Sequence, residues 1–467
     1  MKRPLRNVIS LSVGDAGSRV LGFLITVYLA RVLEPAGFGV IHIGLAVLSY
    51  LALAGSPGIQ ILETRNTARS TRIDYQRIGD VLSLRVVLAL GLWIGVSLVC
   101  VIFIESEDTR DVVILYGASL IPLALLLDWF FQGKEEFTPV GGSKLLNYAI
   151  YGLFVLVLVR SADDVRLTPV AFVLGNVVAA GFLIALYRRR FGQVRFQWQP
   201  ASWKQILRNS VPVGVATFLA QSAINLPPIV IGILLTSADV GVYSAAMKLV
   251  LLLLLLDRIF NGLFLPVVSR YSASKPLDVQ RLVSITIKVI VVVALPLTVC
   301  TVIAANEAVA LIFGSGYEAA GTLAQLLVGY FAITLANSVF GCTLIGIGRE
   351  KEYTRMLIQG STFLVVAVVT LTLFLGINGA ALGVLVGEFS ILVLQVLETK
   401  KVISLRLTKI ILRPALASIA MGFTAYVARE MNVVPVIVIS MAVFAVTIVL
   451  VKGLAKDEIR FLRERFV

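Results

Sequence analysis

The chain has 467 residues, of which 58% are hydrophobic and 15% charged, and its mean hydropathy is +0.94. With this composition a protein surrounded by water would have too little polar surface to cover itself, so a soluble globular fold is excluded. The net charge of +14 is spread over eight separate segments. A nucleic-acid-binding protein would concentrate that charge on one face or arm, so no nucleic-acid partner is expected.

The cysteines, the histidine and the N-terminus narrow the class further. Cys100, Cys300 and Cys342 lie in apolar stretches, and the chain has a single histidine, His42, so neither a disulfide framework nor a metal-binding spacing exists. We expect no metal and no cofactor. Residues 1–6 and the apolar stretch after them mimic a signal peptide. That stretch runs on to about residue 32 without a cleavage motif, so it is predicted to be the first membrane span.

Fourteen stretches are long and apolar enough to cross a bilayer, which needs roughly 20 apolar residues. In chain order they cover approximately residues 9–32, 38–62, 79–104, 111–132, 145–160, 167–187, 210–235, 239–265, 282–306, 319–346, 354–376, 378–399, 408–428 and 432–451. No loop between them is long enough to form a separate domain. The sequence therefore predicts an all-α polytopic membrane protein whose function lies in the helix bundle, with no catalytic residue.

Lysine and arginine collect in every second gap between these stretches. With both ends placed on one side, the even gaps, their margins and the tails hold 31 of the 41 basic residues, whereas the odd gaps hold five and the spans five. The odd gaps are short or acidic, as at residues 105–108 and 162–164. Because basic loops are retained on the cytoplasmic side, the pattern predicts a multi-pass protein of the cell (inner) membrane with both termini in the cytoplasm.

Short motifs recur in the same order at offsets of 202 to 215 residues. The recurring pairs are 37–40 with 239–242, 74–77 with 278–281, and 133–137 with 348–353. They indicate two six-helix lobes of the same topology, at residues 1–200 and 201–405, followed by two additional spans and a basic cytoplasmic tail at 406–467. Parallel repeats of this kind are typical of transporters.

Five basic residues lie inside predicted spans, where a cation at a helix centre costs roughly 2.5 to 3.5 kcal/mol. They are Arg19, Arg85, Lys248, Arg258 and Lys288. Together they would offset the stability of a whole domain if all faced lipid, so most must face a wet cavity or a counter-ion. Cations in a cavity suit an anionic cargo, so these five are the predicted substrate-binding residues.

For some of these cations the sequence leaves a structural role open. Arg85 and Lys288 lie about two turns from their cytoplasmic ends and can snorkel to the interface. Asp15 can pair with Arg19 four residues later, and Asp257 can pair with the neighbouring Arg258. Lys248 has no acid within one helical turn, so it is the hardest to explain without a cavity.

Other polar residues inside the spans are candidates for the cavity or for ion coupling. The acids predicted at depth are Asp15, Asp257 and Glu388, which keep a proton relay or a cation site open. Gln221 and Asn225 lie one turn apart in the seventh span and precede Pro227-Pro228, which must break or kink the helix. Such a helix is either a moving part with a polar face or static packing.

Four motifs along the chain carry a family resemblance. They are Leu29-Ala30-Arg31-Val32-Leu33 with Phe38-Gly39, Asp128-Trp129-Phe130-Phe131-Gln132-Gly133, Gly241-Val242-Tyr243-Ser244-Ala245-Ala246, and Phe313-Gly314-Ser315-Gly316-Tyr317. In order and spacing they resemble the Wzx-type polysaccharide or oligosaccharide flippases of the MOP transporter superfamily, from about residue 8 to residue 400. In addition, residues 18–23 are similar to the first-helix motif of the lipid II flippases, whose arginine corresponds to Arg19.

The resemblance implies a function and a mechanism. Such proteins use alternating access between two six-helix lobes, whose cationic central cavity carries an undecaprenyl-diphosphate-linked sugar chain to the outer leaflet. Arg19 then belongs to the cavity, and Lys248 and Arg258 lie on the span that lines it. The implied partners are the lipid-linked oligosaccharide, membrane lipids, and a polysaccharide polymerase or other assembly proteins.

Other readings of the sequence stay open. A cation-coupled antiporter of the MATE type would use Asp15 for coupling, although such proteins usually have twelve spans. A lipid II flippase proper would share the cationic cavity. A membrane glycosyltransferase, polymerase or ligase would need a sizeable extramembrane loop, whereas the longest outer gap here is about a dozen residues. An accessory scaffold of a polysaccharide assembly complex would transport nothing itself.

Overall fold

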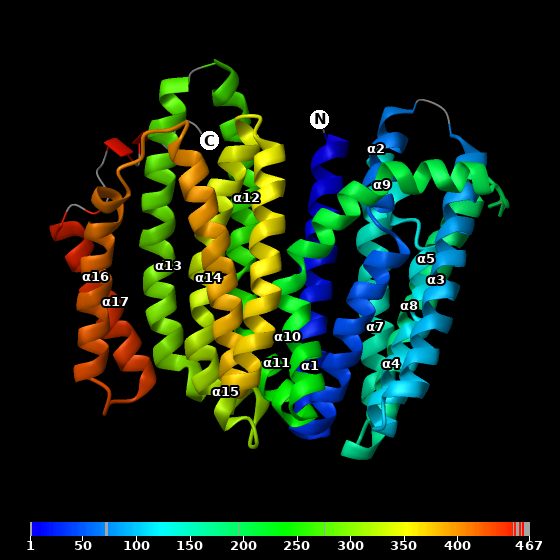
Figure 1. Cartoon of the computed structure of the whole chain (residues 1–467), viewed down its shortest axis with the longest axis horizontal. Coiled ribbons are helices and arrows are strands. Elements are labelled where there is room, and N and C mark those ends of the chain that lie inside the picture. Colours follow the sequence, from blue (N-terminus) through cyan, green and yellow to red (C-terminus); the bar gives the residue numbers. More distant parts are fainter. Residues whose placement is uncertain are drawn as a thin grey trace. The chain divides into compact units, whose positions relative to one another are not determined.

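The computed structural model describes residues 2–70, 73–194, 196–274, 276–451, 453, 457–458 and 460–461; the side chains of 2–13, 216, 273, 274, 276, 277 and 409 lie outside that description. Every regular element within these ranges is a helix (Figure 1), which confirms the predicted all-α fold. Most of the helices stand alongside one another as long rods within their own half of the chain (Figure 1).

The chain divides into two compact units, residues 1–241 and 242–467. The predicted three-part division into 1–200, 201–405 and 406–467 stays a prediction. The first unit contains α1 (Lys2–Gly55), α2 (Ile59–Arg69), α3 (Tyr75–Phe103), α4 (Glu107–Ala118), α5 (Leu120–Leu125), α6 (Asp128–Gly133), α7 (Phe137–Leu158), the 3₁₀ helix η1 (Ala162–Arg166), α8 (Leu167–Phe191), α9 (Pro200–Ala220) and α10 (Ser222–Leu234). The second contains most of α11 (Ser237–Leu253), then α12 (Leu255–Ser274), α13 (Pro276–Phe313), α14 (Glu318–Gly346), α15 (Glu350–Lys400), α16 (Leu407–Val427) and α17 (Val433–Leu450).

The number of membrane crossings follows from the lengths of these helices. In the described ranges, eleven helical segments are long and apolar enough to cross a bilayer, and the bent pair α9–α10 makes a twelfth. The helices α1 and α15 have 54 and 51 residues. At about 1.5 Å per residue each is more than twice as long as the roughly 30 Å hydrocarbon core. Both contain a non-helical residue, Glu34 in α1 and Gly376 in α15. If each of their halves crosses once, the described ranges hold up to fourteen crossings, so the predicted number is met only approximately.

Helix α15 is a helical hairpin that turns at Gly376. This residue has a φ of 61°, a left-handed conformation that glycine adopts without a steric penalty. Residues before and after the turn lie very close together: a Cβ added at Gly379 would overlap the carbonyl of Leu371. A Cβ at Gly387 would lie 2.5 Å from the Cβ of Leu364. Because contact partners move apart symmetrically from the turn, the two halves run antiparallel with their backbones in close approach.

The first half of α1 packs along α7, also through glycines. A Cβ added at Gly14 would lie 2.7 Å from the Cα of Gly141, and one at Gly22 would lie 2.8 Å from the Tyr148 ring. The hydroxyl of Tyr28 donates a hydrogen bond of 2.8 Å to the carbonyl of Val159, just beyond α7. The partner numbers rise together, so the first half of α1 and α7 run parallel, as the predicted first and fifth spans require.

The predicted internal repeat has a structural counterpart inside each unit. In the first unit, the Nε2 of Gln76 donates to the Oε1 of Gln199 across 3.3 Å. In the second, the Nε2 of Gln280 donates to the carbonyl of Ser404 across 2.8 Å. The two donors belong to the repeated Asp-x-Gln-Arg motif, and donor and acceptor are separated by 123 and 124 residues. Equivalent glutamines, at the starts of α3 and α13, thus donate to segments at nearly the same distance along the chain in each unit.

Each unit has an ion pair at the corresponding place, with the acidic and basic positions exchanged. Arg190 at the end of α8 contacts Glu136 just before α7, with 2.6 Å between Nη1 and Oε2. Glu398 near the end of α15 contacts Arg349 just before that helix, again at 2.6 Å. In both units an ion pair therefore connects the start of one span to the end of the next. The acid comes first along the chain in the first unit, and the arginine comes first in the second.

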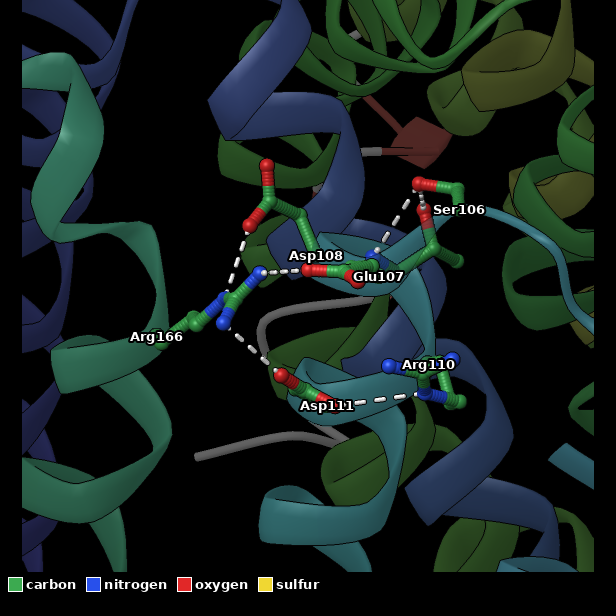
Figure 2. Close-up of polar contacts among 7 residues, drawn as sticks. Ser106, Glu107, Asp108, Arg110, Asp111 and Arg166 are labelled. Atoms are coloured by element: carbon green, nitrogen blue, oxygen red, sulfur yellow. Dashed lines mark hydrogen bonds and ion pairs between the residues drawn. The ribbon is translucent and has the colours of Figure 1, made fainter. Parts of the chain in front are cut away.

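The acidic loop after α3, which the sequence places on the outer side, is held by one arginine (Figure 2). The guanidinium of Arg166 in η1 lies 3.4 Å from Glu107, 2.8 Å from Asp108 and 3.0 Å from Asp111. Glu107 and Asp108 stand in the first turn of α4, where carboxylates favour the positive end of the helix dipole. Ser106 caps the same helix by accepting from the Thr109 amide.

Candidate functional site

The polar residues predicted inside the membrane spans are divided between the two units. The first unit holds Asp15, Arg19, Arg85, Gln221 and Asn225, and the second holds Lys248, Asp257, Arg258, Lys288 and Glu388.

Asp15 and Arg19 form an ion pair that also includes a lysine from α7. The Oδ2 of Asp15 lies 2.7 Å from the Nε of Arg19, and its Oδ1 lies 3.2 Å from the Nζ of Lys144. All three side chains are partly exposed. Sequence reasoning missed Lys144, because the predicted fifth span begins one residue later, whereas α7 begins at Phe137. One carboxylate between two cations leaves a net positive charge that an anionic ligand can neutralise.

Arg85 lies in a closed environment and is bound to backbone carbonyls. It is 2% exposed, and its Nη1 and Nη2 donate to the carbonyls of Leu126 and Leu123 at 3.0 and 2.7 Å. These carbonyls lie where the predicted fourth span is interrupted between α5 and α6. The C-terminal end of a helix has unpaired carbonyls and a negative dipole, so the guanidinium compensates both. These contacts favour the structural role for Arg85.

The seventh span is bent by 64° between α9 and α10, and Gln221 lies at the bend. Helix α10 then continues through Pro227 and Pro228. A proline removes the hydrogen bond to the residue four positions earlier and its ring crowds that carbonyl, which here involves residues 223 and 224. The predicted kink is present at Gln221, six residues before Pro227. Asn225 lies in the first turn of α10, and its backbone N–H donates to the backbone carbonyl of Gln221 at 3.0 Å.

Lys248 and Arg258 differ from the other intramembrane cations. Lys248 is partly buried in α11, and Arg258 is exposed at the start of α12. In the part of the chain that the structure describes, neither side chain forms a hydrogen bond or an ion pair, whereas Arg19, Arg85 and Lys288 all do. Two cations on neighbouring helices thus have no carboxylate within ion-pair distance.

Asp257 is held by a polar network between α12 and α14. The Nδ2 of Asn261 donates to the Oδ2 of Asp257 at 3.0 Å, and the hydroxyl of Ser338 donates to Oδ1. The thiol of Cys342 donates to the Oδ1 of Asn261 at 2.9 Å. Asp257 therefore takes neutral partners and forms no ion pair with its neighbour Arg258. The sequence contained the i, i+4 spacing of Asp257 and Asn261 but no sign of the contribution from α14.

Glu388 of α15 is bound by Asn337 of α14, the residue that precedes Ser338. The Nδ2 of Asn337 donates to the Oε2 of Glu388 at 2.8 Å and to its backbone carbonyl at 3.3 Å. Within the described ranges no basic group lies within ion-pair distance of Glu388 or Asp257. No three His, Cys, Asp or Glu side chains among the residues searched come together to hold a metal ion.

Lys288 is paired with the C-terminal segment. Its Nζ lies 2.8 and 2.9 Å from the two carboxylate oxygens of Glu458, and the residue is 9% exposed. About two turns nearer the start of α13, Arg281 lies 3.6 Å from Asp457. The charge of Lys288 is thus neutralised by Glu458, a residue that was not among the predicted partners.

A cavity of about 330 Å³ lies between α2, the start of α3, and α6, and none of these residues lines it. Within it, Arg77 forms two hydrogen bonds to the buried Glu63, of 2.6 and 3.2 Å, and the Nζ of Lys134 donates to the carbonyl of Ser70. Because its cations already have protein partners, we do not assign the cargo to this cavity.

Comparison with known proteins supports one family. Residues 5–272 match the family described as polysaccharide biosynthesis protein, which agrees with the resemblance found in the motifs. A putative O-antigen transporter from Escherichia coli (strain K12) is 22% identical over 407 residues, covering 82% of this chain and 93% of that protein.

Solved structures share the fold. A lipid II flippase, MurJ, in an inward-closed conformation matches with a TM-score of 0.76 and 13% identity, covering 94% of this chain and 98% of that chain. A multidrug resistance MATE family transporter of the MOP superfamily in an inward-facing conformation matches with a TM-score of 0.65 and 14% identity, covering 85% and 97%. The predicted MOP-like architecture is confirmed, and the chain is a multi-pass membrane protein.

Proposed function

Because the chain belongs to the polysaccharide biosynthesis protein family, we propose that it moves a lipid-linked oligosaccharide across the cytoplasmic membrane for the synthesis of cell-surface polysaccharide. The cargo class is a sugar chain on undecaprenyl diphosphate. The family match, the similarity to a putative O-antigen transporter and the fold shared with a lipid II flippase support this function. The proposal assigns the protein no catalytic reaction.

The observation that carries the proposal is the set of cations without a full complement of carboxylates. Lys248 and Arg258 have no ion-pair partner among the described residues, and the Asp15, Arg19 and Lys144 group keeps one positive charge. A cation inside the bilayer is stable only with a counter-charge or water. A diphosphate supplies several acceptor oxygens and negative charge, so its binding compensates these groups. Binding by an uncharged sugar alone would not.

The proposed mechanism is alternating access. The diphosphate and sugar bind the cationic residues from the cytoplasmic side while the lipid tail stays in the bilayer, and a conformational change opens the site to the outer side. The comparison structures in inward-facing and inward-closed conformations belong to proteins of the same fold, which supports this type of cycle. The bent seventh span, with Gln221 at its bend, is the element we assign to the movement.

A transport assay with purified protein tests the function. Proteoliposomes with a fluorescent undecaprenyl-diphosphate oligosaccharide should show translocation by the native chain and little by Lys248→Ala. Lys401→Ala is the matched control, because Lys401 is exposed and pairs only at the surface with Glu398. Translocation by Lys248→Ala at the native rate would remove Lys248 from the site.

Two rival cargoes are tested in the same vesicles. The carboxylates Asp257 and Glu388, which have no ion-pair partner among the described residues, favour a cation-coupled antiporter of the MATE type as the second candidate. Uptake of an organic cation driven by a proton or sodium gradient, without movement of the oligosaccharide, would support it. Translocation of lipid II in preference to the oligosaccharide would identify a lipid II flippase.

The orientation is also part of the proposal. We place the protein in the cell (inner) membrane with both termini in the cytoplasm, on the basis of the alternation of basic loops. A polysaccharide polymerase or other assembly proteins are the protein partners that the family suggests.

A further inference from the structure

Lys288 needs a counter-group, because it is buried within a membrane span. It follows Asp278, the first residue of the span that α13 provides, by ten residues, or about 15 Å along the helix. With 9% of its surface exposed, its ammonium cannot be hydrated as it would be at the interface. A lysine at this position is stable only if a protein group replaces the lost water.

The equivalent cation of the first unit is compensated in a different way. Arg85 lies at nearly the same level in α3 as Lys288 in α13: they follow the first residue of the Asp-x-Gln-Arg motif by eleven and ten residues. Arg85 donates to two backbone carbonyls, of Leu123 and Leu126, at the interruption between α5 and α6. The corresponding span of the second unit is α14, which is continuous over 29 residues. A continuous helix uses its carbonyls internally, so it has none to offer to Lys288.

The C-terminal segment supplies the missing partner. Glu458 contacts the Nζ of Lys288 with both carboxylate oxygens. Arg281, seven residues earlier on the same face of α13, lies 3.6 Å from Asp457, and its guanidinium stands 4.6 Å from the ring centre of Phe461. Three contacts therefore fasten one short stretch of the tail to two turns of one helix.

The same face of α13 also carries the last two spans. Val292, four residues beyond Lys288, and Val299 pack against a cluster formed by Ala417 and Met421 of α16 and Phe444 of α17. Asp457, Glu458 and Phe461, which follow α17 in the chain, thus contact the helix on which α16 and α17 also pack. Fixing the tail closes a loop that begins and ends at α13.

We propose that Asp457, Glu458 and Phe461 form a latch, in which Glu458 is the permanent counter-ion of Lys288, and that their docking fixes α16 and α17 to the second lobe. Lys288 then serves the architecture of the lobe, and the cargo is bound by the remaining cations of the proposed function. The latch compensates the charge of Lys288 in the second lobe, as the carbonyls at the α5–α6 interruption compensate that of Arg85 in the first. It concerns the fold of the second unit and does not depend on the identity of the cargo.

A charge cycle on the full-length protein tests the latch. Glu458→Gln should lower the unfolding midpoint in detergent by several degrees, because it leaves a buried ammonium unpaired. The double variant Lys288→Met with Glu458→Gln should regain most of the loss, since neither buried charge is left. The exchange Lys288→Glu with Glu458→Lys should also be tolerated better than either single change. Asp457→Asn is the matched control: its pair with Arg281 is exposed, so its effect should be small.

Crosslinking and transport separate the latch from a role in cargo binding. With Cys100, Cys300 and Cys342 replaced by serine, cysteines at 288 and 458 should be joined in high yield by a short bis-maleimide. The Lys288→Met and Glu458→Gln double variant should then transport at close to the native rate. A midpoint unaffected by Glu458→Gln, or crosslinking at background level, would overturn the latch. A stable double variant without transport would return Lys288 to the cargo site.

Discussion

At the scale of single residues, the five intramembrane cations are distinguished by what each side chain contacts. Arg85 reaches two carbonyls and Lys288 a carboxylate, both in enclosed surroundings. Arg19 shares a carboxylate with Lys144, and Lys248 has no described partner. The insertion cost alone treats the five alike, so it identified the set without separating structural from binding residues.

Arg85 and Lys248 should therefore respond differently to the same kind of substitution. Arg85→Met leaves the carbonyls at the α5–α6 interruption without their charged donor, and should lower the free energy of unfolding by about 1.5 to 3 kcal/mol for each strong bond lost. Lys248→Ala should leave the unfolding midpoint near the native value and abolish transport. Thermal unfolding in detergent measures the first effect and the proteoliposome assay the second. An Arg85→Met protein of native stability that no longer transports would contradict this division.

Lys144 should matter to the cargo about as much as Arg19 does. Removing either cation makes the group around Asp15 neutral, so Lys144→Ala and Arg19→Ala should each raise the KM for a diphosphate-linked cargo roughly three- to tenfold, the effect of one partly exposed charge. Lys144→Arg keeps the charge and is the control. A KM unchanged by Lys144→Ala would place the group away from the cargo.

At the scale of secondary-structure elements, close approach between helices is governed by glycine. The α15 hairpin depends on Gly379, Gly383 and Gly387, which lie opposite backbone or Cβ atoms of its other half. The sequence predicted two spans, 354–376 and 378–399, with a single residue between them. It gave no measure of how near their backbones lie, because helix separation depends on which faces meet.

Enlarging one of these glycines should separate the two halves of the hairpin. Gly387→Ala places a Cβ 2.5 Å from the Leu364 Cβ, so overpacking should lower the free energy of unfolding by about 1 to 3 kcal/mol. Gly422→Ala in α16 is the matched control, since no atom lies within 4 Å of its added Cβ. Unfolding midpoints of the two variants give the comparison. Equal midpoints would mean that the hairpin relaxes without cost.

At the scale of the whole molecule, the alternation of basic and acidic gaps predicts which loops face the cytoplasm. We expect an impermeant maleimide to label Asp163→Cys in intact cells, and to label Arg189→Cys only after permeabilisation, in a background without the three native cysteines. Both positions are exposed in the structure. Labelling of Arg189→Cys in intact cells would reverse the proposed orientation.

Much of the architecture follows from the sequence alone, because the bilayer imposes strict requirements on any chain within it. Span lengths, the breaks between the spans on either side of Glu34 and beside Gly376, the repeat, and the kink before Pro227 all reflect local composition and backbone chemistry. The family resemblance likewise depends on short local motifs, and the family match confirms it.

Only the tertiary structure decided which partner each buried polar group takes. Glu458 lies 170 residues from Lys288 along the chain, Ser338 lies 81 residues from Asp257, and Lys144 lies 129 residues from Asp15. The interruption that binds Arg85 was likewise invisible, since residues 111–132 read as one apolar span. An apolar pattern determines that a helix crosses the membrane, whereas the rotation and packing of the helices determine which side chains meet, and that depends on the whole chain at once.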